Sequence, residues 1–382
     1  MEERVGDLRP HGGNNSLQGG TLQGNWYERR QKEIEFEDVQ PTVVVVGAGQ
    51  AGLNIGARLQ TMNLSCLILD KNERIGDNWR LRYRTLVTHD PVQYTDMAYM
   101  PFPTTWPLFT LKDKLADWQW SITINTDGDS VRTLKPKHVI FCTGQACEPK
   151  IPTFSGQDTF NGTIYHGSQH KDASFSNVTG KKVIVVGTGN SGHDIAQNFH
   201  ENGASVTMLQ RRGTYVISAK TGLFMLHKGL YEEHGPPTED ADIYGQSLPI
   251  PVQFALNVGG TAAIKAAEAD QLAGLEKAGF KLDFGEDGSG IYRKYITRGG
   301  GYYIDVGASQ LIIDGKIRVV QSPGGIAAFE AGGLVLADGR KLEADVVVLA
   351  TGFDNMRTTL RKKLGDKVAD RAKDEWGLNE EV

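Results

Sequence analysis

The chain has 382 residues, of which 46 are glycine and 14 are proline, and its formal net charge is −5. This length predicts two or three domains whose cores need no disulfide or metal. The composition excludes a collagen-like or Pro/Gly-rich disordered chain, and the slight excess of acidic side chains argues against a sequence-independent nucleic-acid binder. The surplus glycine is therefore expected at particular turns.

Neither a membrane segment nor a metal site is expected. No apolar run approaches the roughly 18 residues of a membrane span, and the polar N-terminus holds no hydrophobic signal core. Cys66, Cys142 and Cys147 form no C-x-x-C pair, which argues against a disulfide framework, a zinc site and a redox pair. We therefore expect a cytoplasmic protein without bound metal.

The predicted elements begin after a polar N-terminal region, 1–40, in which 1–24 is expected to be a flexible tail and 25–40 a charged helix or arm. Apolar or β-branched runs that end at a turn predict strands at 42–46, 65–70, 137–141, 182–186, 205–209 and 345–350. Helices are predicted at 50–59 and 191–199, with a proline-containing linker at 148–156 and a mixed segment at 213–310. The order strand, helix, strand, strand therefore occurs twice, which indicates an internal duplication of architecture.

The first glycine cluster, residues 47–52 (GAGQAG), follows a predicted strand and opens a predicted helix. Gly47 permits a tight turn, Gly49 lets the backbone approach a pyrophosphate, and Gly52 allows the helix to pack closely on the strand. Free N–H groups at the helix N-terminus then face the phosphates. Asp70 ends the next strand, where an acid holds a ribose hydroxyl. The pattern predicts a dinucleotide site; the alternative is a glycine-rich turn with no ligand.

The second cluster, residues 187–192 (GTGNSG), has the same strand–helix context, but no acid ends its second strand. Arg211 and Arg212 stand there instead. A carboxylate at this point repels a 2′-phosphate, whereas a guanidinium binds one through two hydrogen bonds. The cluster therefore favours NADPH over NADH, unless both arginines are merely solvated. Two dinucleotide sites in one chain indicate an electron relay, and the resident partner of NADPH is most often FAD.

Several further motifs resemble those of the flavin-containing monooxygenases, the class B flavoprotein monooxygenases. The segment 160–166 (F-x-G-x-x-x-H) is similar to the identifying motif of that family, with His170 at its last aromatic position. The loop 75–80 (IGDNWR) resembles its glycine–tryptophan loop near the flavin. Residues 350–353 (ATGF) and 142–144 (CTG) resemble its two strand-ending signatures, and 80–103 is closer to the plant and fungal branch than to the animal one.

The resemblance implies an α/β fold of two nested, doubly wound, Rossmann-like domains, with the NADPH domain inserted into the FAD domain. The expected boundaries are 41–150 for the first part of the FAD domain, 151–320 for the NADPH domain and 321–382 for the second FAD part. The implied reaction is N- or S-oxygenation of a small molecule with O2, of the N,N-dimethylaniline monooxygenase type, through a C4a-hydroperoxyflavin. The flavin supplies this chemistry, and the protein positions cofactors and excludes water. The oligomeric state is left open.

The fingerprints and the resemblance together nominate a set of residues for binding FAD and NADPH. They are Gly47, Gly49, Gln50, Gly52, Asp70, Lys71, Gly76, Trp79, Thr143, Gly144, Gly187, Gly189, Asn190, Ser191, Gly192, Arg211, Arg212, Thr351 and Gly352. The catalytic residue is not assigned.

His89 and Asn190 are the catalytic candidates, because the active-site asparagine of the animal enzymes has no clear match here. The alternatives are a plain turn at His89-Asp90 before Pro91 and a helix start at Asn190. Trp79 either contacts the flavin or only packs. His166 is expected to be a hydrogen-bonded structural histidine.

Two departures from the family pattern bear on activity. Chain is expected to be missing between Trp118 and Ser121, and again after Val382, where the family continues with a segment that covers the flavin. The resemblance therefore predicts weak FAD retention and NADPH oxidation uncoupled from oxygenation. The competing interpretations are a catalytically impaired nucleotide-binding remnant, a flavin reductase and a Baeyer–Villiger monooxygenase. The resemblance to the plant branch also makes an arylpyruvate a candidate substrate.

Overall fold

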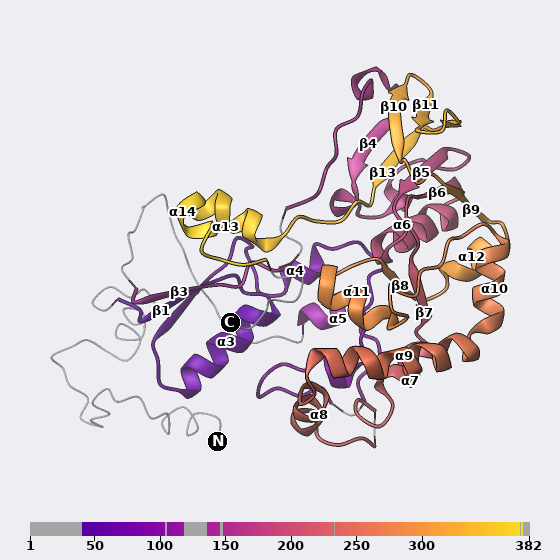
Figure 1. Ribbon diagram of the computed structural model, residues 1–382. Coiled ribbons are helices and arrows are strands. Elements are labelled where there is room, and N and C mark those ends of the chain that lie inside the picture. The colour runs from indigo at the N-terminus through magenta and orange to yellow at the C-terminus, as the bar shows by residue number, and fades with distance from the viewer. Residues whose placement is uncertain are drawn as a thin grey trace, which may run out of the picture. The chain divides into compact units, whose positions relative to one another are not determined.

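The computed structural model describes residues 40–103, 105–117, 136–145, 148–232, 234–374 and 376. The expected tail and arm, the junction between Trp118 and Ser121, Cys147 and the C-terminal end lie outside the described residues. The chain divides into two compact units, which are described separately (Figure 1). The first comprises 1–81, 96–103 and 113–144, and the second comprises 82–95, 104–112 and 145–382.

The first unit is built on a parallel three-stranded sheet in the order β2-β1-β3. Its strands are β1 (Val43–Val46), β2 (Cys66–Leu69) and β3 (His138–Phe141), and its helices are α3 (Gln50–Thr61), α4 (Asp77–Arg80) and α5 (Lys112–Asp117). Helix α3 runs along the sheet in Figure 1 and packs Leu53 and Leu59 with Val43 and Val45 in one apolar cluster. The predicted strand–helix–strand unit and its third strand are confirmed.

The second unit is built on a parallel five-stranded sheet in the order β4-β13-β5-β6-β9. Its strands are β4 (Thr163–His166), β5 (Lys182–Val186), β6 (Ser205–Gln210), β9 (Ile317–Gln321) and β13 (Val346–Leu349). The central order β6-β5-β13 repeats the order β2-β1-β3, and β5 is followed by α6 (Asn190–Glu201) as β1 is by α3. The predicted duplication is therefore present in the fold.

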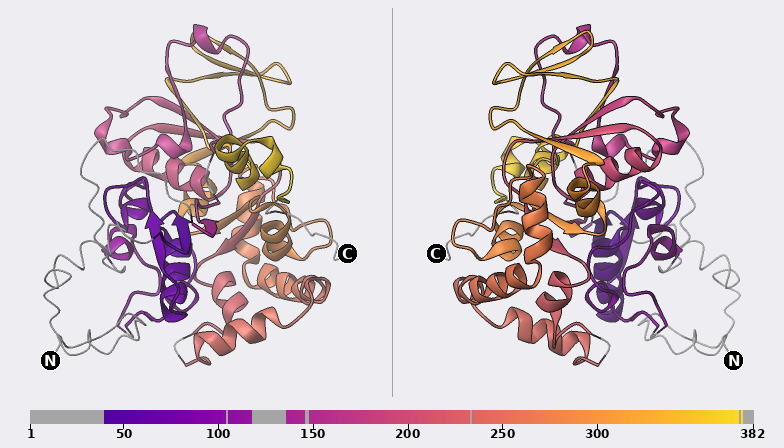
Figure 2. Two further views of the ribbon diagram at one scale, coloured as in Figure 1. Left: turned by 90° about the vertical axis from the view of Figure 1, so that its left-hand side faces the viewer. Right: turned by 90° about the vertical axis from the view of Figure 1, so that its right-hand side faces the viewer.

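The sheet of the second unit buries both faces, because alternate residues of a strand point to opposite sides. Val183 and Val185 of β5 pack with α6, whereas Ile184 between them packs with Phe329 on the other side. The other side is covered by a small antiparallel sheet of β10 (Ile326–Glu330), β11 (Gly333–Leu336) and β12 (Lys341–Glu343). In both views of Figure 2 this sheet stands at the end of the second unit opposite its long helices.

The segment expected to be mixed, 213–310, is largely helical and carries a two-stranded parallel sheet. Its elements are β7 (Tyr215–Ser218), α7 (Gly222–His227), α8 (Thr238–Gln246), α9 (Ile250–Ala267), α10 (Ala269–Lys277), α11 (Gly290–Arg298) and β8 (Tyr302–Asp305). The unit is completed by α12 (Ala308–Ile313), α13 (Met356–Leu364) and α14 (Asp366–Ala369). Among the described residues, no helix is both long and apolar enough to cross a membrane.

The two units differ from the expected domain boundaries at two places. Residues 82–95 belong to the second unit, where the Arg84 amide donates a hydrogen bond to the Lys171 carbonyl. The described part of 321–382 belongs there as well, because β13 pairs with β4 and β5 and Lys362 of α13 forms an ion pair with Glu148. The described part of 321–382 therefore clusters with the second unit, and the predicted domain boundaries stay a prediction. The cofactor assignment of 321–382 also stays a prediction.

Candidate dinucleotide sites

In each fingerprint, the first and last glycines are required by the backbone packing of the chain, whether or not a ligand binds. Gly47 has φ +110°, and a Cβ there would lie 2.2 Å from the Cys142 carbonyl oxygen. A Cβ on Gly52 would lie 1.8 Å from the Gly47 carbonyl oxygen, so the helix could not approach the strand turn. Gly187 and Gly192 repeat this arrangement, with φ +121° at Gly187 and a distance of 2.4 Å from a Gly192 Cβ to the Gly187 oxygen.

The middle glycine of each fingerprint meets no such barrier. A Cβ on Gly49 would come no closer than 3.5 Å to a neighbour, the side-chain nitrogen of Asn78, and one on Gly189 no closer than 3.8 Å. These are ordinary contacts, so the fold does not require glycine at either position. Each glycine is the N-cap of a helix of 12 residues, where free N–H groups bind phosphate. Both loops therefore fit a dinucleotide whose pyrophosphate lies against the middle glycine.

The two fingerprints differ at the residue after the second strand. Asp70 follows β2, and its Oδ2 accepts a 2.6 Å hydrogen bond from the Ala48 amide inside the first fingerprint. Gln210, at the same register after Leu209, is buried instead and exchanges two hydrogen bonds with the backbone of Lys281, at 2.7 and 2.9 Å. Only the first site thus has a carboxylate at its ribose position. Lys71, beside Asp70, is exposed.

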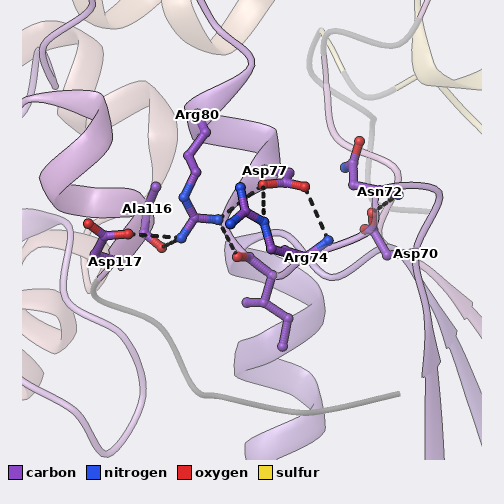
Figure 3. Close-up of polar contacts among 8 residues, drawn as sticks. Asp70, Asn72, Arg74, Asp77, Arg80, Ala116 and Asp117 are labelled. Atoms are coloured by element: carbon purple, nitrogen blue, oxygen red, sulfur yellow. Dashed lines mark hydrogen bonds and ion pairs between the residues drawn. The ribbon is translucent and has the colours of Figure 1, made fainter. Parts of the chain in front are cut away.

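The loop after Asp70 is held by an arginine with four hydrogen bonds (Figure 3). The Arg80 guanidinium lies between the carboxylates of Asp77 and Asp117, at 3.0 and 2.9 Å. Burial opposes ionisation of Asp77, but hydrogen bonds from Arg80 and the Arg74 amide, and the charges of both arginines, lower its pKa. Gly76 has φ +89°, and a Cβ there would lie 2.3 Å from the Ala116 carbonyl oxygen. The loop geometry is therefore fixed by the protein.

Two side chains from this loop bear on a ligand at the first fingerprint. Asn78, whose amide nitrogen is the nearest neighbour of Gly49, has a buried Oδ1 with no hydrogen-bond partner among the described residues. Buried polar atoms rarely stay unpaired, so this oxygen fits a donor on a bound molecule. Trp79 is half-buried. These positions fit the cofactor predicted for this site.

A groove at the second fingerprint gathers the predicted arginines. Its volume is about 590 Å³, and its lining residues are Arg211, Arg212, Gly213, Lys281, Leu282, Asp283 and Pro323. Neither guanidinium has an ion pair or hydrogen bond to another residue that the structure describes, and both are exposed. Three of the lining side chains are cationic and one is anionic. The groove therefore fits a phosphate group beyond the ribose position of the second site.

Comparisons with known proteins show which proteins this chain is similar to. The model for flavin-binding monooxygenase-like proteins matches residues 92–223, and that for NAD(P)-binding Rossmann-like domains matches 45–95. Indole-3-pyruvate monooxygenase YUCCA1 of Oryza sativa subsp. japonica is 27% identical over 359 residues, covering 85% of this chain and 80% of the relative. Probable indole-3-pyruvate monooxygenase YUCCA3 of Arabidopsis thaliana is 27% identical, covering 81% of this chain and 72% of the relative. The chain is therefore similar to flavin-containing monooxygenases over most of its length.

Solved structures agree with this fold. An oxidized steroid monooxygenase bound to NADP has a TM-score of 0.59 and 20% identity, covering 84% of this chain and 73% of its own. A cyclohexanone monooxygenase bound to epsilon-caprolactone has a TM-score of 0.55 and 17% identity, covering 82% and 73%. The two matched family models indicate an oxidoreductase and a flavoprotein that uses FAD and NADPH.

The family's identifying motif has a structural role in this chain. His166 ends β4; its Nε2 donates a 3.0 Å hydrogen bond to the Gly352 carbonyl, and its Nδ1 accepts one from the Ser168 amide. Burial lowers its pKa, although the bond to Gly352 opposes this. His170 hydrogen-bonds Tyr165 and Asn198. The motif therefore ties β4 to the end of β13 and to α6.

The strand-ending signatures form turns in this chain. Gly144 and Gly352 have φ +83° and +79°, and the space that a Cβ would occupy is open at both. Thr351 donates a 2.5 Å hydrogen bond to the Lys150 carbonyl, and Thr143 lies half-buried beside Cys142.

At the helix starts, the Asn190 side chain accepts a 2.9 Å hydrogen bond from the Ile304 amide, whereas Gln50 and Ser191 are exposed. Asn190 thus supports β8.

His89 lies in the second unit, in a buried cluster that sequence reasoning missed. Its Nε2 is 4.0 Å from Oδ2 of Asp194 on α6, and Tyr83 donates a hydrogen bond to the same oxygen. Burial raises the pKa of Asp194, despite the opposing effects of His89 and Tyr83. Burial also raises the pKa of Asp90, the residue that follows His89 in sequence. The apolar-periodic pattern of α6 gave no signal for a buried acid.

Another missed residue, His193, lies within α6 behind the second fingerprint. Its ring stacks on Tyr303 with centroids 3.6 Å apart, and its Nδ1 donates a 3.0 Å hydrogen bond to the Gly189 carbonyl. Burial lowers its pKa to about 4, so the imidazole is neutral near pH 7. The hydrogen bond from His193 therefore supports Gly189, the middle glycine of the second fingerprint. A histidine directly after a glycine-rich motif carries no sequence signal for this role.

Proposed function

We propose that this chain is a flavin monooxygenase that oxidatively decarboxylates an arylpyruvate, with FAD in the first unit and NADPH in the second. The observation that carries the cofactor assignment is the contrast after the two fingerprints. An acid follows the first, and a cationic groove follows the second. The substrate class is supported by the relatives, which are named indole-3-pyruvate monooxygenases and cover most of this chain.

The first fingerprint would hold FAD. The amides at the start of α3 face the pyrophosphate, because Gly49 leaves the backbone open to it. Asp70 is held by the Ala48 amide and retains acceptor capacity for a ribose hydroxyl. The loop fixed by Arg80 would place the Asn78 side chain, the nearest neighbour of Gly49, beside the flavin nucleotide. Trp79, next to it in sequence, stays a predicted flavin contact.

The second fingerprint would hold NADPH. The amides at the start of α6 face the pyrophosphate at Gly189, which the stacked pair His193 and Tyr303 supports. Arg211 and Arg212 would bind the 2′-phosphate, since a guanidinium matches phosphate with two parallel hydrogen bonds.

FAD held at the first fingerprint would supply the oxygen-transfer chemistry, with NADPH as the reductant and O2 as the oxidant. The balanced reaction converts a 2-oxo acid, O2, NADPH and a proton into the carboxylic acid one carbon shorter, CO2, NADP⁺ and water. The chain's own residues bind and orient both nucleotides. The reaction balances without a proton donated or accepted by any described residue. His89 stays a candidate catalytic residue because of its place beside Asp194.

Visible absorption and product analysis test the proposal. The protein supplied with FAD is expected to consume NADPH with O2 faster when phenylpyruvate or indole-3-pyruvate is added, yielding CO2 and the shortened acid. N,N-dimethylaniline, thioanisole and cyclohexanone serve as comparison substrates. Oxygenation of one of these without decarboxylation of the 2-oxo acids would contradict the substrate class. A colourless protein that FAD does not reconstitute would contradict the enzyme assignment altogether.

A further inference from the structure

One wall of the cationic groove is a short segment held to the end of β6. The Thr214 amide donates a hydrogen bond to the Lys281 carbonyl, and the Asp283 amide donates one to the Thr214 carbonyl. The Gln210 side chain hydrogen-bonds both the amide and the carbonyl of Lys281. Thr214 also hydrogen-bonds Thr188 of the second fingerprint, with 2.7 Å between the hydroxyl oxygens. The wall therefore has a fixed position relative to the fingerprint.

This wall places an acid among the phosphate-binding cations. Asp283 lines the groove together with Arg211, Arg212 and Lys281, and its side chain is 37% exposed. A Cβ on Gly213 would lie 2.5 Å from the Asp283 Cβ, so the acid sits directly against the chain that follows the two arginines. An unpaired carboxylate here would oppose a phosphate dianion in the same groove.

A buried lysine pairs with this acid from behind. Lys294 of α11 is only 1% exposed, and its Nζ lies 2.5 Å from Asp283 Oδ2. The other oxygen, Oδ1, accepts a 2.9 Å hydrogen bond from the Gly285 amide. Burial alone would raise the pKa of Asp283, but the hydrogen bonds from Lys294 and Gly285 and the charges of Lys294 and Arg298 lower it. The carboxylate is therefore ionised and neutralised by a lysine outside the groove.

We propose that Lys294 is a specificity-determining residue for the 2′-phosphate, acting through Asp283. Because Lys294 neutralises Asp283, the wall can hold a carboxylate in a fixed position while the net charge of the groove stays positive. Lys294 is a positioning residue, because it does not itself line the groove. The inference rests on the proposed NADPH site.

A purely structural role for this pair makes a different prediction. Burying an ammonium is costly, and an apolar residue of similar volume is often equally stable at such a position. A structural pair, once broken, would weaken binding of nucleotides with and without the 2′-phosphate alike. A charge-neutralising pair would affect only the 2′-phosphorylated nucleotide.

Calorimetric titration of the FAD-loaded protein with 2′,5′-ADP and with 5′-AMP separates these roles. Lys294→Met is expected to weaken 2′,5′-ADP binding about tenfold or more and to leave 5′-AMP binding unchanged. The double variant Asp283→Asn/Lys294→Met is expected to restore the wild-type preference, since both charges are gone. An equal loss for both nucleotides, or no restoration in the double variant, would overturn the inference.

The single variant Asp283→Asn keeps the test decisive if Lys294→Met does not fold. Asparagine still accepts the Lys294 hydrogen bond, and the groove gains one net positive charge. It is expected to bind 2′,5′-ADP more tightly than the wild type, and weaker binding would contradict the proposal. Wild-type protein that shows no preference for 2′,5′-ADP over 5′-AMP would instead refute the NADPH site itself, so the two failures are distinguishable.

Discussion

The Asp70 carboxylate accepts a hydrogen bond from the Ala48 amide across the mouth of the first fingerprint, with 2.6 Å between Oδ2 and the nitrogen. Its other oxygen accepts one from the Asn72 amide at 2.8 Å. The acid therefore orders the glycine-rich turn before any ligand binds. A residue expected to contact ribose also shapes the loop that contacts pyrophosphate.

These two roles of Asp70 can be separated by substitution. Asp70→Asn keeps one acceptor oxygen for the Ala48 amide and loses the acceptor that the Asn72 amide uses, so stability is expected to fall by only about 1 kcal/mol. Loss of the charge-assisted bond to a ribose hydroxyl weakens FAD binding about tenfold. Asp70→Ala removes both and is expected to lower stability by about 1–2 kcal/mol as well. The flavin-to-protein absorbance ratio and the melting temperature measure the two effects. Full FAD retention in Asp70→Ala would show that the acid does not serve the cofactor.

The first fingerprint offers a matched pair of glycine substitutions. Gly52→Ala puts a Cβ 1.8 Å from a backbone oxygen and is expected to unfold the first unit or lower its stability severely. Gly49→Ala meets only the Asn78 side chain at 3.5 Å, so the variant is expected to fold with near wild-type stability but to lose FAD. Circular dichroism and bound flavin report the two outcomes. A Gly49→Ala protein with wild-type flavin content would mean that no pyrophosphate lies against this loop.

Both strand–helix–strand units were predictable, because their signals are local. A β-branched run, a glycine turn and an apolar-periodic helix lie within about 30 residues, and Val43 to Val46 pairs with β2 and β3 as expected. The two arginines that follow β6 were predictable for the same reason.

The partners of distant segments were not predictable from local patterns. The sequence of residues 345–350 does not indicate which of the two parallel sheets the strand joins, because a buried strand has the same apolar pattern in either sheet. Pairing of Val346 with Val183 decides it. The Tyr83–Asp194 contact joins residues far apart in sequence, and buried polar pairs leave no periodic signal. Lys281 and Asp283 line the groove, and their backbone is held there by hydrogen bonds with Gln210 and Thr214 respectively.

The coenzyme preference is expected to depend on the two arginines. Arg211→Gln/Arg212→Gln should raise KM for NADPH at least about 10- to 100-fold, because even one charge-assisted hydrogen bond contributes roughly 1.5–3 kcal/mol. KM for NADH should stay nearly unchanged. The NADPH affinity of the wild type should also fall with ionic strength more steeply than that of the variant. Steady-state NAD(P)H oxidation measures both. Arg318→Gln, an exposed arginine on β9 outside the groove, is the control. Equal losses for both coenzymes would contradict the assignment.

The buried imidazole of His193 is expected to make the second unit acid-sensitive. Its pKa is lowered from 6.5 to about 4, chiefly by burial, with the bond to Gly189 and the charge of Asp305 opposing the shift. The unfolded chain therefore binds a proton below about pH 6.5 that the folded chain does not bind until about pH 4. Stability from this group is complete above pH 6.5 and is lost as the pH falls toward 4, by up to about 1.4 kcal/mol per pH unit.

His193→Phe isolates this contribution, because phenylalanine can keep the stack on Tyr303 but does not titrate. From pH 7 to pH 5, the free energy of urea unfolding should fall by about 2 kcal/mol more in the wild type than in the variant. His227, whose pKa burial also lowers to about 4, stays in both proteins and cancels in the difference. His227→Phe should flatten the pH dependence similarly. Parallel pH curves for the wild type and His193→Phe would show that His193 does not resist protonation in the folded state.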